Sequence, residues 1–193
     1  VDALIQSGRE THERQALIEM VERSDDREKT IVMADRGYES YNVFEHIKQK
    51  GWNYLIRIKD INSSGISSGL YLPHAEIFDE EINFLLTRRQ TNEVKSNPKI
   101  YKFISSNQIF DYLLPEDRGT YPMSFRIVRF PISEDTYEVL ITNLKEDEFS
   151  IEKLKELDCQ HFFVQLLFGH ICKTIFYRSP IFQTAVNSFI IVP

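Results

Sequence analysis

Short apolar runs alternate with amphipathic segments along the first third of the chain. Residues 30–35 (TIVMAD) are nearly all apolar and too few for an amphipathic helix, which is typical of a strand buried on both faces. Residues 52–59 (WNYLIRIK) form a second strand-like run. Between them, apolar positions 43, 44 and 47 recur at helical spacing, with Ser40 placed to cap the helix and Gly51 to end it. This order predicts a helix that connects two parallel strands.

An additional strand and helix are expected before this unit. Residues 1–5 are typical of the end of a strand, and Ser7 with Glu10 has the spacing of a capping box. The helix that follows is expected to run to about Arg23. Its predicted buried face contains Leu17, Met20 and Val21. Strand and helix therefore alternate through residues 1–60, which predicts an α/β fold.

The pattern changes after Asp60. A Ser/Gly-rich loop, INSSGISSG, is typical of a connection between subdomains. Short β-prone stretches follow at residues 82–88, 100–104, 124–130 and 137–142. We predict a β-rich insertion over residues 61–136, after which the chain returns to the main sheet in residues 137–193.

The last part of the chain begins with a helical pattern at residues 146–157. Ser150 is a suitable cap, and Ile151, Leu154 and Leu157 recur on one face. Residues 159–193 contain only two full charges and follow neither helical nor strand periodicity. Two interpretations remain: a buried terminal helix followed by a strand, or a sequence that was never selected to fold.

The charge of the chain is unevenly distributed. The net charge of −6 argues against simple electrostatic binding of nucleic acid. Residues 82–130, however, contain eight Lys/Arg against four Asp/Glu, whereas residues 1–81 contain ten against sixteen. A bound polyanion is therefore expected on the segment 82–130. Its basic residues are Arg88, Arg89, Lys95, Lys99, Lys102, Arg118, Arg126 and Arg129.

The two cysteines, Cys159 and Cys172, are separated by twelve residues, which argues against a disulfide framework and against a zinc site, although His161 and His170 lie nearby. All apolar runs are shorter than the roughly 20 residues of a membrane span. We expect a cytoplasmic protein with no membrane partner. Because Val1 already lies in an apolar stretch, the sequence is expected to begin partway into a larger protein.

Asp35 is the first candidate for chemistry. It follows a buried strand, and functional side chains of parallel sheets gather beyond the carboxyl ends of the strands. A carboxylate there suits Mg²⁺, and two such ions can drive phosphodiester cleavage, provided that further ligands are present. The alternative is that Asp35 only caps the next helix or pairs with Arg36.

Other motifs are weaker. Arg57 and Lys59 alternate with isoleucines, so both are expected on one side of their strand near Asp35, where they either contact phosphate or form a solvated face. No phosphate-binding loop, dinucleotide motif or hydrolase motif is present. His12, His46 and His74 are expected to be surface or rim residues rather than bases.

Two adjacent arginines form the centre of the basic segment. Arg88 and Arg89, with Phe84 and Phe103 in neighbouring strands, are placed to line a nucleic-acid channel. The alternative is an ordinary soluble β surface.

Several stretches, taken together, resemble the transposase domain of bacterial insertion sequences of the DDE type. They are DALIQSGRETHERQALIEMVE, ADRGYES, IKQKGWNYLIRIKD and YEVLITNLKEDEFSIEKLKEL, in this order. The resemblance covers about residues 1–157 and is closest to the branch with a β-rich insertion between the second and third catalytic acids. It implies a ribonuclease-H-like mixed sheet with flanking helices. It also implies Mg²⁺-dependent DNA cleavage and strand transfer at the terminal repeats of a mobile element, with DNA and another transposase chain as partners.

The resemblance assigns roles to a few residues. Asp35 matches the second acid of the triad and is the implied catalytic residue and metal ligand. Arg36 and Tyr38 match the rest of its box and are implied DNA contacts, together with Arg57, Lys59, Arg88 and Arg89. In the family, the first acid lies on a strand upstream of the region that begins here. Asp2 matches a different, noncatalytic position of the family pattern.

The position of the third acid departs from the family pattern. An ungapped alignment of the family's Tyr, Arg-Trp and Glu places Asp158 at the Tyr, His161 at the Arg and Gln165 at the Glu. Glutamine supplies no anionic oxygen, and a frameshift after Asp158 would also explain the loss of charge. We therefore expect a truncated, inactive transposase. Two alternatives are a noncatalytic inhibitor that binds DNA or intact transposase, and an unrelated α/β metal phosphohydrolase with more acids around Asp35.

Overall fold

The computed structural model describes residues 12–25, 30–168, 175–177 and 188–192. At its centre, β1 (Thr30–Ala34) and β2 (Asn53–Ile58) pair in parallel, with Ile31 opposite Asn53. Every residue of β1 is buried, as its apolar sequence requires. The connecting helix is α2 (Tyr41–Gln49), which confirms the predicted strand–helix–strand unit.

The ends of α2 follow the sequence signals in part. Gly51 has φ of 79°, and the N–H of Trp52 donates to the carbonyl of Ile47, so the glycine ends the helix as predicted. Ser40 occupies the N-cap position, but its side chain makes no capping hydrogen bond within the described residues. The preceding turn is η1 (Arg36–Tyr38).

The β-rich insertion extends the same sheet. Its elements are η2 (Ser67–Gly69), β3 (Phe78–Thr87), α3 (Asn92–Ser96), β4 (Tyr101–Phe103) and β5 (Thr120–Ser133). A hairpin joins β5 to β6 (Thr136–Thr142), and β6 pairs antiparallel with β2. β6 thus returns the chain to β2. Core and insertion therefore share one mixed sheet with the order β4-β3-β5-β6-β2-β1-β8-β7.

The C-terminal elements are α4 (Ile151–Phe168), β7 (Ile175–Tyr177) and β8 (Ser188–Val192). Since β8 pairs in parallel with β1, the described residues adopt the helix-and-strand arrangement, one of the two interpretations. The prediction that this helix begins at residue 146 is wrong. The buried guanidinium of Arg126 binds the carbonyl of Phe149 at 2.7 Å, which holds this segment in a loop until Ser150.

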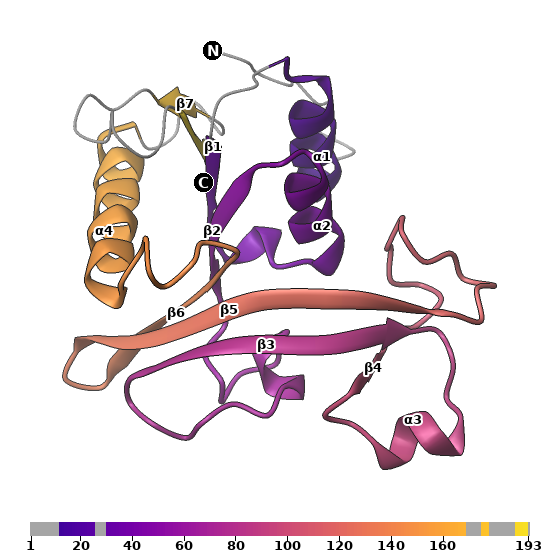
Figure 1. Cartoon of the computed structure of the whole chain (residues 1–193). Coiled ribbons are helices and arrows are strands. Elements are labelled where there is room, and N and C mark those ends of the chain that lie inside the picture. Colours follow the sequence, from indigo (N-terminus) through magenta and orange to yellow (C-terminus); the bar gives the residue numbers. More distant parts are fainter. Residues whose placement is uncertain (1–11, 26–29, 169–174, 178–187, 193) are drawn as a thin grey trace.

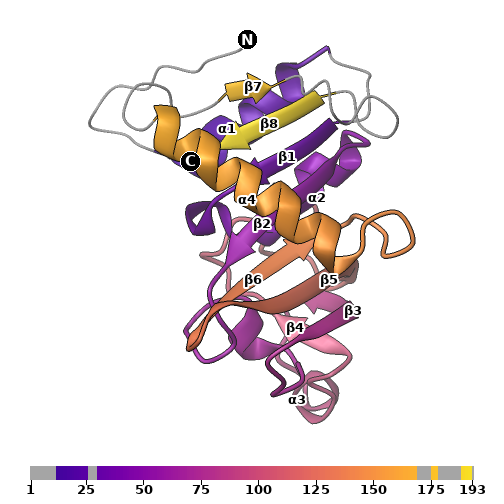
Figure 2. The same ribbon diagram turned by 90° about the vertical axis from the view of Figure 1, so that its left-hand side faces the viewer.

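Helices cover both faces of the sheet near β1 and β2. Figures 1 and 2 show α1 (Glu13–Arg23) and α2 on one face and α4 on the other. Two hydrophobic clusters result: one contains Val21 and Phe44 with the inner side of the insertion strands, and the other contains Leu154 and Leu157. Mixed α/β composition, a mixed sheet and flanking helices agree with a ribonuclease-H-like fold.

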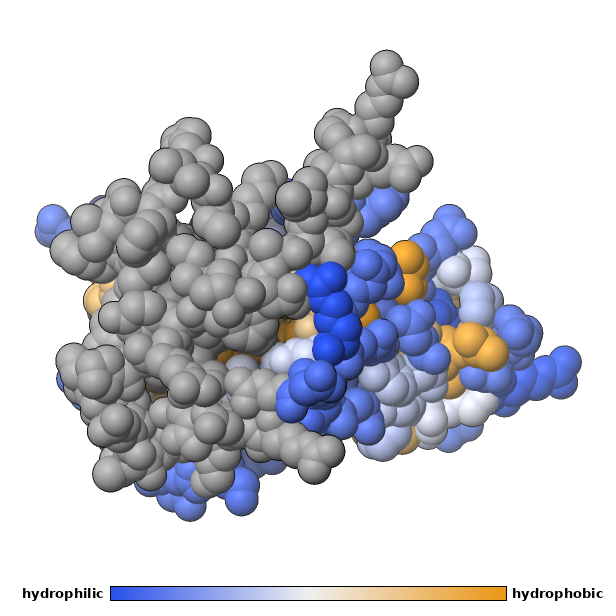
Figure 3. Space-filling view, turned by 90° about the horizontal axis from the view of Figure 1, so that it is seen from above, coloured by the Kyte–Doolittle hydropathy of each residue, from blue (hydrophilic) through white to orange (hydrophobic). Residues whose placement is uncertain are grey.

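Some expectations lie outside the described residues, among them the strand at residues 1–5 and the capping box of Ser7 and Glu10. None of the described helices has the length and apolar character needed to cross a membrane. In the view of Figure 3, the described surface is mainly hydrophilic and carries scattered apolar side chains.

Candidate nucleic-acid interface around Asp35

Asp35 lies immediately after β1, at the edge where the parallel strands β1 and β2 both end. The buried run of β1 fixes its backbone position. Its Oδ1 accepts a hydrogen bond of 2.8 Å from the backbone N–H of Arg36, and its side chain is half-buried. The expected cap is therefore confirmed, although Asp35 caps the short η1 turn rather than α2.

Two arginines accompany Asp35, and each is paired with an acid from another element. Arg36, whose side chain is 49% exposed, donates from Nη2 to Oε1 of Glu138 at 3.1 Å. Arg57 binds Asp158 through two bonds, Nε to Oδ1 at 2.7 Å and Nη2 to Oδ2 at 3.0 Å. Its Nε also lies 3.7 Å from Oε2 of Glu138. We call these five residues the Asp35 cluster.

Tertiary packing assembles this cluster. Glu138 is on β6, beside β2, and Asp158 is on α4 directly after the buried Leu157. The side chains of Arg57, Glu138 and Asp158 are 12%, 5% and 8% exposed. Glu138 lies in one of the stretches that carry the family resemblance, and Asp158 directly follows the predicted helix of residues 146–157, but no local pattern pairs either acid with an arginine.

Burial and neighbouring charges shift the pKa values of two members of the cluster, Glu138 and Arg57. Burial raises the pKa of Glu138, while Arg36 and Arg57 oppose that change. Burial alone would lower the pKa of Arg57, but the hydrogen bond and charge of Asp158, together with Glu138 and Asp35, raise it. Arg57 is therefore held as a cation that faces carboxylates.

A two-metal centre does not fit this arrangement. Asp35 supplies one carboxylate, whereas the carboxylates of Glu138 and Asp158 are engaged by guanidinium groups. Within the described ranges, no group of three His, Cys, Asp or Glu side chains is placed to hold a metal ion. A Mg²⁺ ion on Asp35 would need most of its ligands from water or phosphate.

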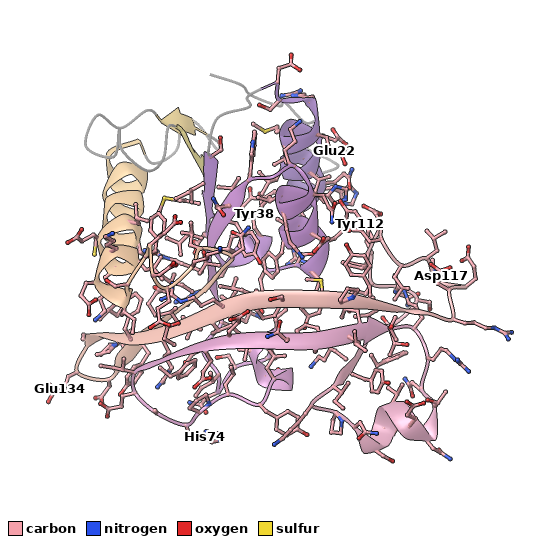
Figure 4. All side chains as sticks on the ribbon, in the orientation of Figure 1. Glu22, Tyr38, His74, Tyr112, Asp117 and Glu134 are labelled. Carbon is pink, nitrogen blue, oxygen red and sulfur yellow. The ribbon has the colours of Figure 1, made fainter. Side chains whose placement is uncertain are left out.

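Two other residues of this region have structural contacts. Tyr38 is 4% exposed and lies inside the molecule (Figure 4), where burial and Glu13 raise its pKa to about 12. Lys59 is exposed, and its backbone N–H donates to Oε2 of Glu39 at 3.2 Å. Lys59 thus offers a cation to solvent, whereas Tyr38 belongs to the core.

The two adjacent arginines of the insertion, Arg88 and Arg89, have different surroundings. Arg88 binds three backbone carbonyls: Leu113 at 3.1 and 2.9 Å, Gln108 at 2.9 Å, and Ser105. Arg89 is exposed. The two phenylalanines expected beside them are separated by the fold.

Phe84 is 7% exposed and packs against Tyr41 and Phe125, so it is not open to a base. Phe103 is 38% exposed. The expected channel of two arginines and two phenylalanines is therefore not assembled as such. Exposed Arg89 and Phe103 are the members that solvent can reach.

His46 forms a contact that the sequence did not indicate. Its Nδ1 lies 2.8 Å from Oε1 of Glu22, and its Nε2 lies 2.8 Å from Oδ2 of Asp111. This side chain is 10% exposed and joins α1, α2 and the insertion. Figure 4 labels Glu22 and the neighbouring Tyr112 on this side of the molecule. His46 is therefore a partly buried residue between these elements, and Asp111 reaches it from a distant part of the chain.

A comparison with models of protein families identifies the family of this chain. The model described as "Transposase DDE domain" matches residues 1–176. The chain belongs to the DDE transposase family. No curated protein and no solved structure matches it. Membership excludes the alternative of an unrelated phosphohydrolase.

The family match has two consequences for the site. It continues to residue 176 and so includes α4 and position 165. DDE transposases act on DNA and use divalent metal ions, which agrees with the resemblance read from the motifs. The sequence argues against a zinc site near Cys159 and His161. Of these two side chains the structure describes that of Cys159, which is free and exposed.

Proposed function

We propose that this chain is a transposase-family protein that docks on DNA at the terminal repeats of a mobile element without cutting it. The observation that carries this proposal is Gln165. The ungapped family pattern aligns it with the third acid, and it lies on α4 within the range that the family model matches. An amide oxygen carries no negative charge and cannot replace a metal-bridging carboxylate.

Exposed cations support the docking half of the proposal. Arg36 and Lys59 flank the Asp35 edge, and the insertion adds exposed basic side chains. These are Arg89, Lys95, Lys99 and Arg118. Phosphate contacts of this kind provide affinity without sequence information. A protein that occupies element ends in this way would inhibit intact transposase by competition.

Cleavage is tested with a supercoiled plasmid that carries the element ends, incubated with the full chain and Mg²⁺. We expect no nicking above background. Nicking that disappears in Asp35→Ala, but persists in Glu134→Gln at the distant β5–β6 turn, would contradict the loss of catalysis. Glu134 is exposed, so its replacement controls for charge alone.

Docking is tested by gel shifts of element-end duplexes over a range of salt concentrations. We expect affinity to fall with salt, and the triple variant Arg89→Gln, Lys95→Gln, Lys99→Gln to reduce the salt slope by about one per lost phosphate contact. Lys155→Gln on α4 is the matched control. An unchanged slope in the triple variant would count against the insertion as the DNA-binding face.

A further inference from the structure

We propose that Arg57 is a phosphate-binding side chain of the Asp35 edge, and that the carboxylate of Asp158 occupies its phosphate site in this chain. The inference rests on the proposed function, since the phosphate is that of DNA. In this arrangement the carboxylate of Asp158 is an intramolecular anion that competes with DNA for the guanidinium of Arg57. The evidence is the geometry, the burial and the charge of the Asp35 cluster.

The geometry is that of anion recognition. The guanidinium of Arg57 presents Nε and Nη2 to the two oxygens of Asp158, at 2.7 and 3.0 Å. Arginine binds carboxylate and phosphate through the same pair of parallel N–H donors. A phosphodiester oxygen pair at this guanidinium would therefore need the place that Asp158 now fills.

The location is that of the reactive edge. Ala34, the last residue of β1, pairs with Ile56 on β2, so Asp35 and Arg57 follow at the same edge of the sheet. DNA that approached Asp35 would bring phosphates to this same edge. Arg57 is thus a cation at this edge whose position is fixed by two hydrogen bonds.

The charge balance explains why the carboxylate weakens the binding of phosphate. The cluster contains three carboxylates, Asp35, Glu138 and Asp158, against two guanidinium groups, and so carries one net negative charge. At exposures of 12% and 8%, the Arg57–Asp158 pair is shielded from solvent screening. Neutralising Asp158 removes both the net charge and the direct competitor.

The placement on α4 connects Asp158 with the lost catalytic position. Asp158 lies on α4 seven residues before Gln165, the position at which the ungapped family pattern places the third acid. Asp158 itself faces the Asp35 edge, where it binds Arg57.

The experiment compares Asp158→Asn with Glu156→Gln in the full chain. Both remove one negative charge from α4, but Glu156 is exposed and outside the cluster. Binding is measured with an element-end duplex, as in the gel-shift experiment. We expect Asp158→Asn to bind about tenfold more tightly than the unaltered chain and Glu156→Gln to differ by less than about twofold. Adding Arg57→Gln to Asp158→Asn should abolish the gain.

A second measurement uses the unaltered chain, in case Asp158→Asn folds poorly. The ¹⁵N NMR signal of the Arg57 Nε–H should move when the duplex is added, because the group exchanges carboxylate for phosphate. Equal affinity of Asp158→Asn and Glu156→Gln, or an unmoved Arg57 signal in a chain that does bind DNA, overturns the inference and leaves the proposed function intact. Absence of binding by the unaltered chain and all variants overturns the proposed function and the inference with it.

Discussion

Two arginines that share a predicted role, Arg57 and Arg88, are held in opposite ways. Arg57 lies at the Asp35 edge and is bound by the carboxylate of Asp158. Arg88 lies in the insertion and is bound by neutral backbone carbonyls of the segment 105–113. The first is a cation neutralised by a charge, and the second is a cation used as a structural hydrogen-bond donor.

The difference shows that the number of basic residues in a segment does not give its available positive charge. Residues 82–130 contain eight basic side chains. Arg88 serves the loop, Arg126 binds Asp79 and two carbonyls, and Arg129 binds Asp60. The exposed cations that remain, rather than the total number of basic residues, determine how strongly this surface attracts a polyanion.

The largest effect is expected where a buried charge loses its partner. Asp158→Ala should lower the free energy of unfolding by about 3 kcal/mol, because it leaves the guanidinium of Arg57 buried without its bidentate carboxylate. Urea denaturation measures the loss. Glu156→Ala, at an exposed position of the same helix, should change stability by less than about 0.5 kcal/mol. Similar losses of stability in both variants would contradict the expected difference between the buried Asp35 cluster and the exposed surface of α4.

The carbonyl-bound arginine should have the next largest effect. Arg88→Ala removes bonds to three carbonyls and should cost about 2 kcal/mol, since bonds that involve a charged group contribute roughly 1.5–3 kcal/mol. The neighbouring Arg89→Ala is the control, because that side chain is exposed. Limited proteolysis should show faster cleavage within residues 105–119 in Arg88→Ala alone.

A pair of tyrosines tests the same principle with neutral groups. The hydroxyl of Tyr41 is buried and has no hydrogen-bond partner within the described part of the chain, so Tyr41→Phe should raise stability by about 1 kcal/mol. The hydroxyl of Tyr121 donates to Glu45 at 2.8 Å, so Tyr121→Phe should lower stability by about 1 kcal/mol. Thermal denaturation measures the change in stability for each variant. Changes of the same sign in Tyr41→Phe and Tyr121→Phe would contradict this difference between the two hydroxyl groups.

The smallest effect concerns the dependence of stability on pH. Arg129 holds the pKa of Asp60 below its usual value through a side-chain hydrogen bond, so this pair stabilises the fold above the unfolded pKa of about 3.9. As the pH falls through the lower folded pKa, that contribution disappears. The difference between the unaltered chain and Asp60→Asn should therefore vanish in acid. The loss of stability in Arg88→Ala should not change with pH in this range, because the backbone carbonyls that Arg88 binds do not titrate. Denaturation curves at several pH values compare Asp60→Asn with Arg88→Ala.

The sequence alone determined the local elements and the family. The apolar run Ile31–Ala34, the helical spacing after Ser40 and Gly51 at the helix end predicted β1, α2 and their connection, since those signals act through neighbouring residues. The family motifs anticipated the family match, and Asp35 was placed correctly at the end of β1. The start of α4 was predicted too early because Arg126, a residue far back in the chain, holds Phe149 in a loop.

Only the tertiary structure decided which side chains meet. Arg57 and Asp158 are 101 residues apart, and Arg36 and Glu138 are 102 apart, so no local pattern predicts either pair. The same holds for His46 and Asp111, which are separated by 65 residues. The pairing of β6 with β2 and the packing of α4 across the sheet bring these groups together. Local periodicity fixes which face a residue occupies, whereas the partner on that face depends on how distant segments pack.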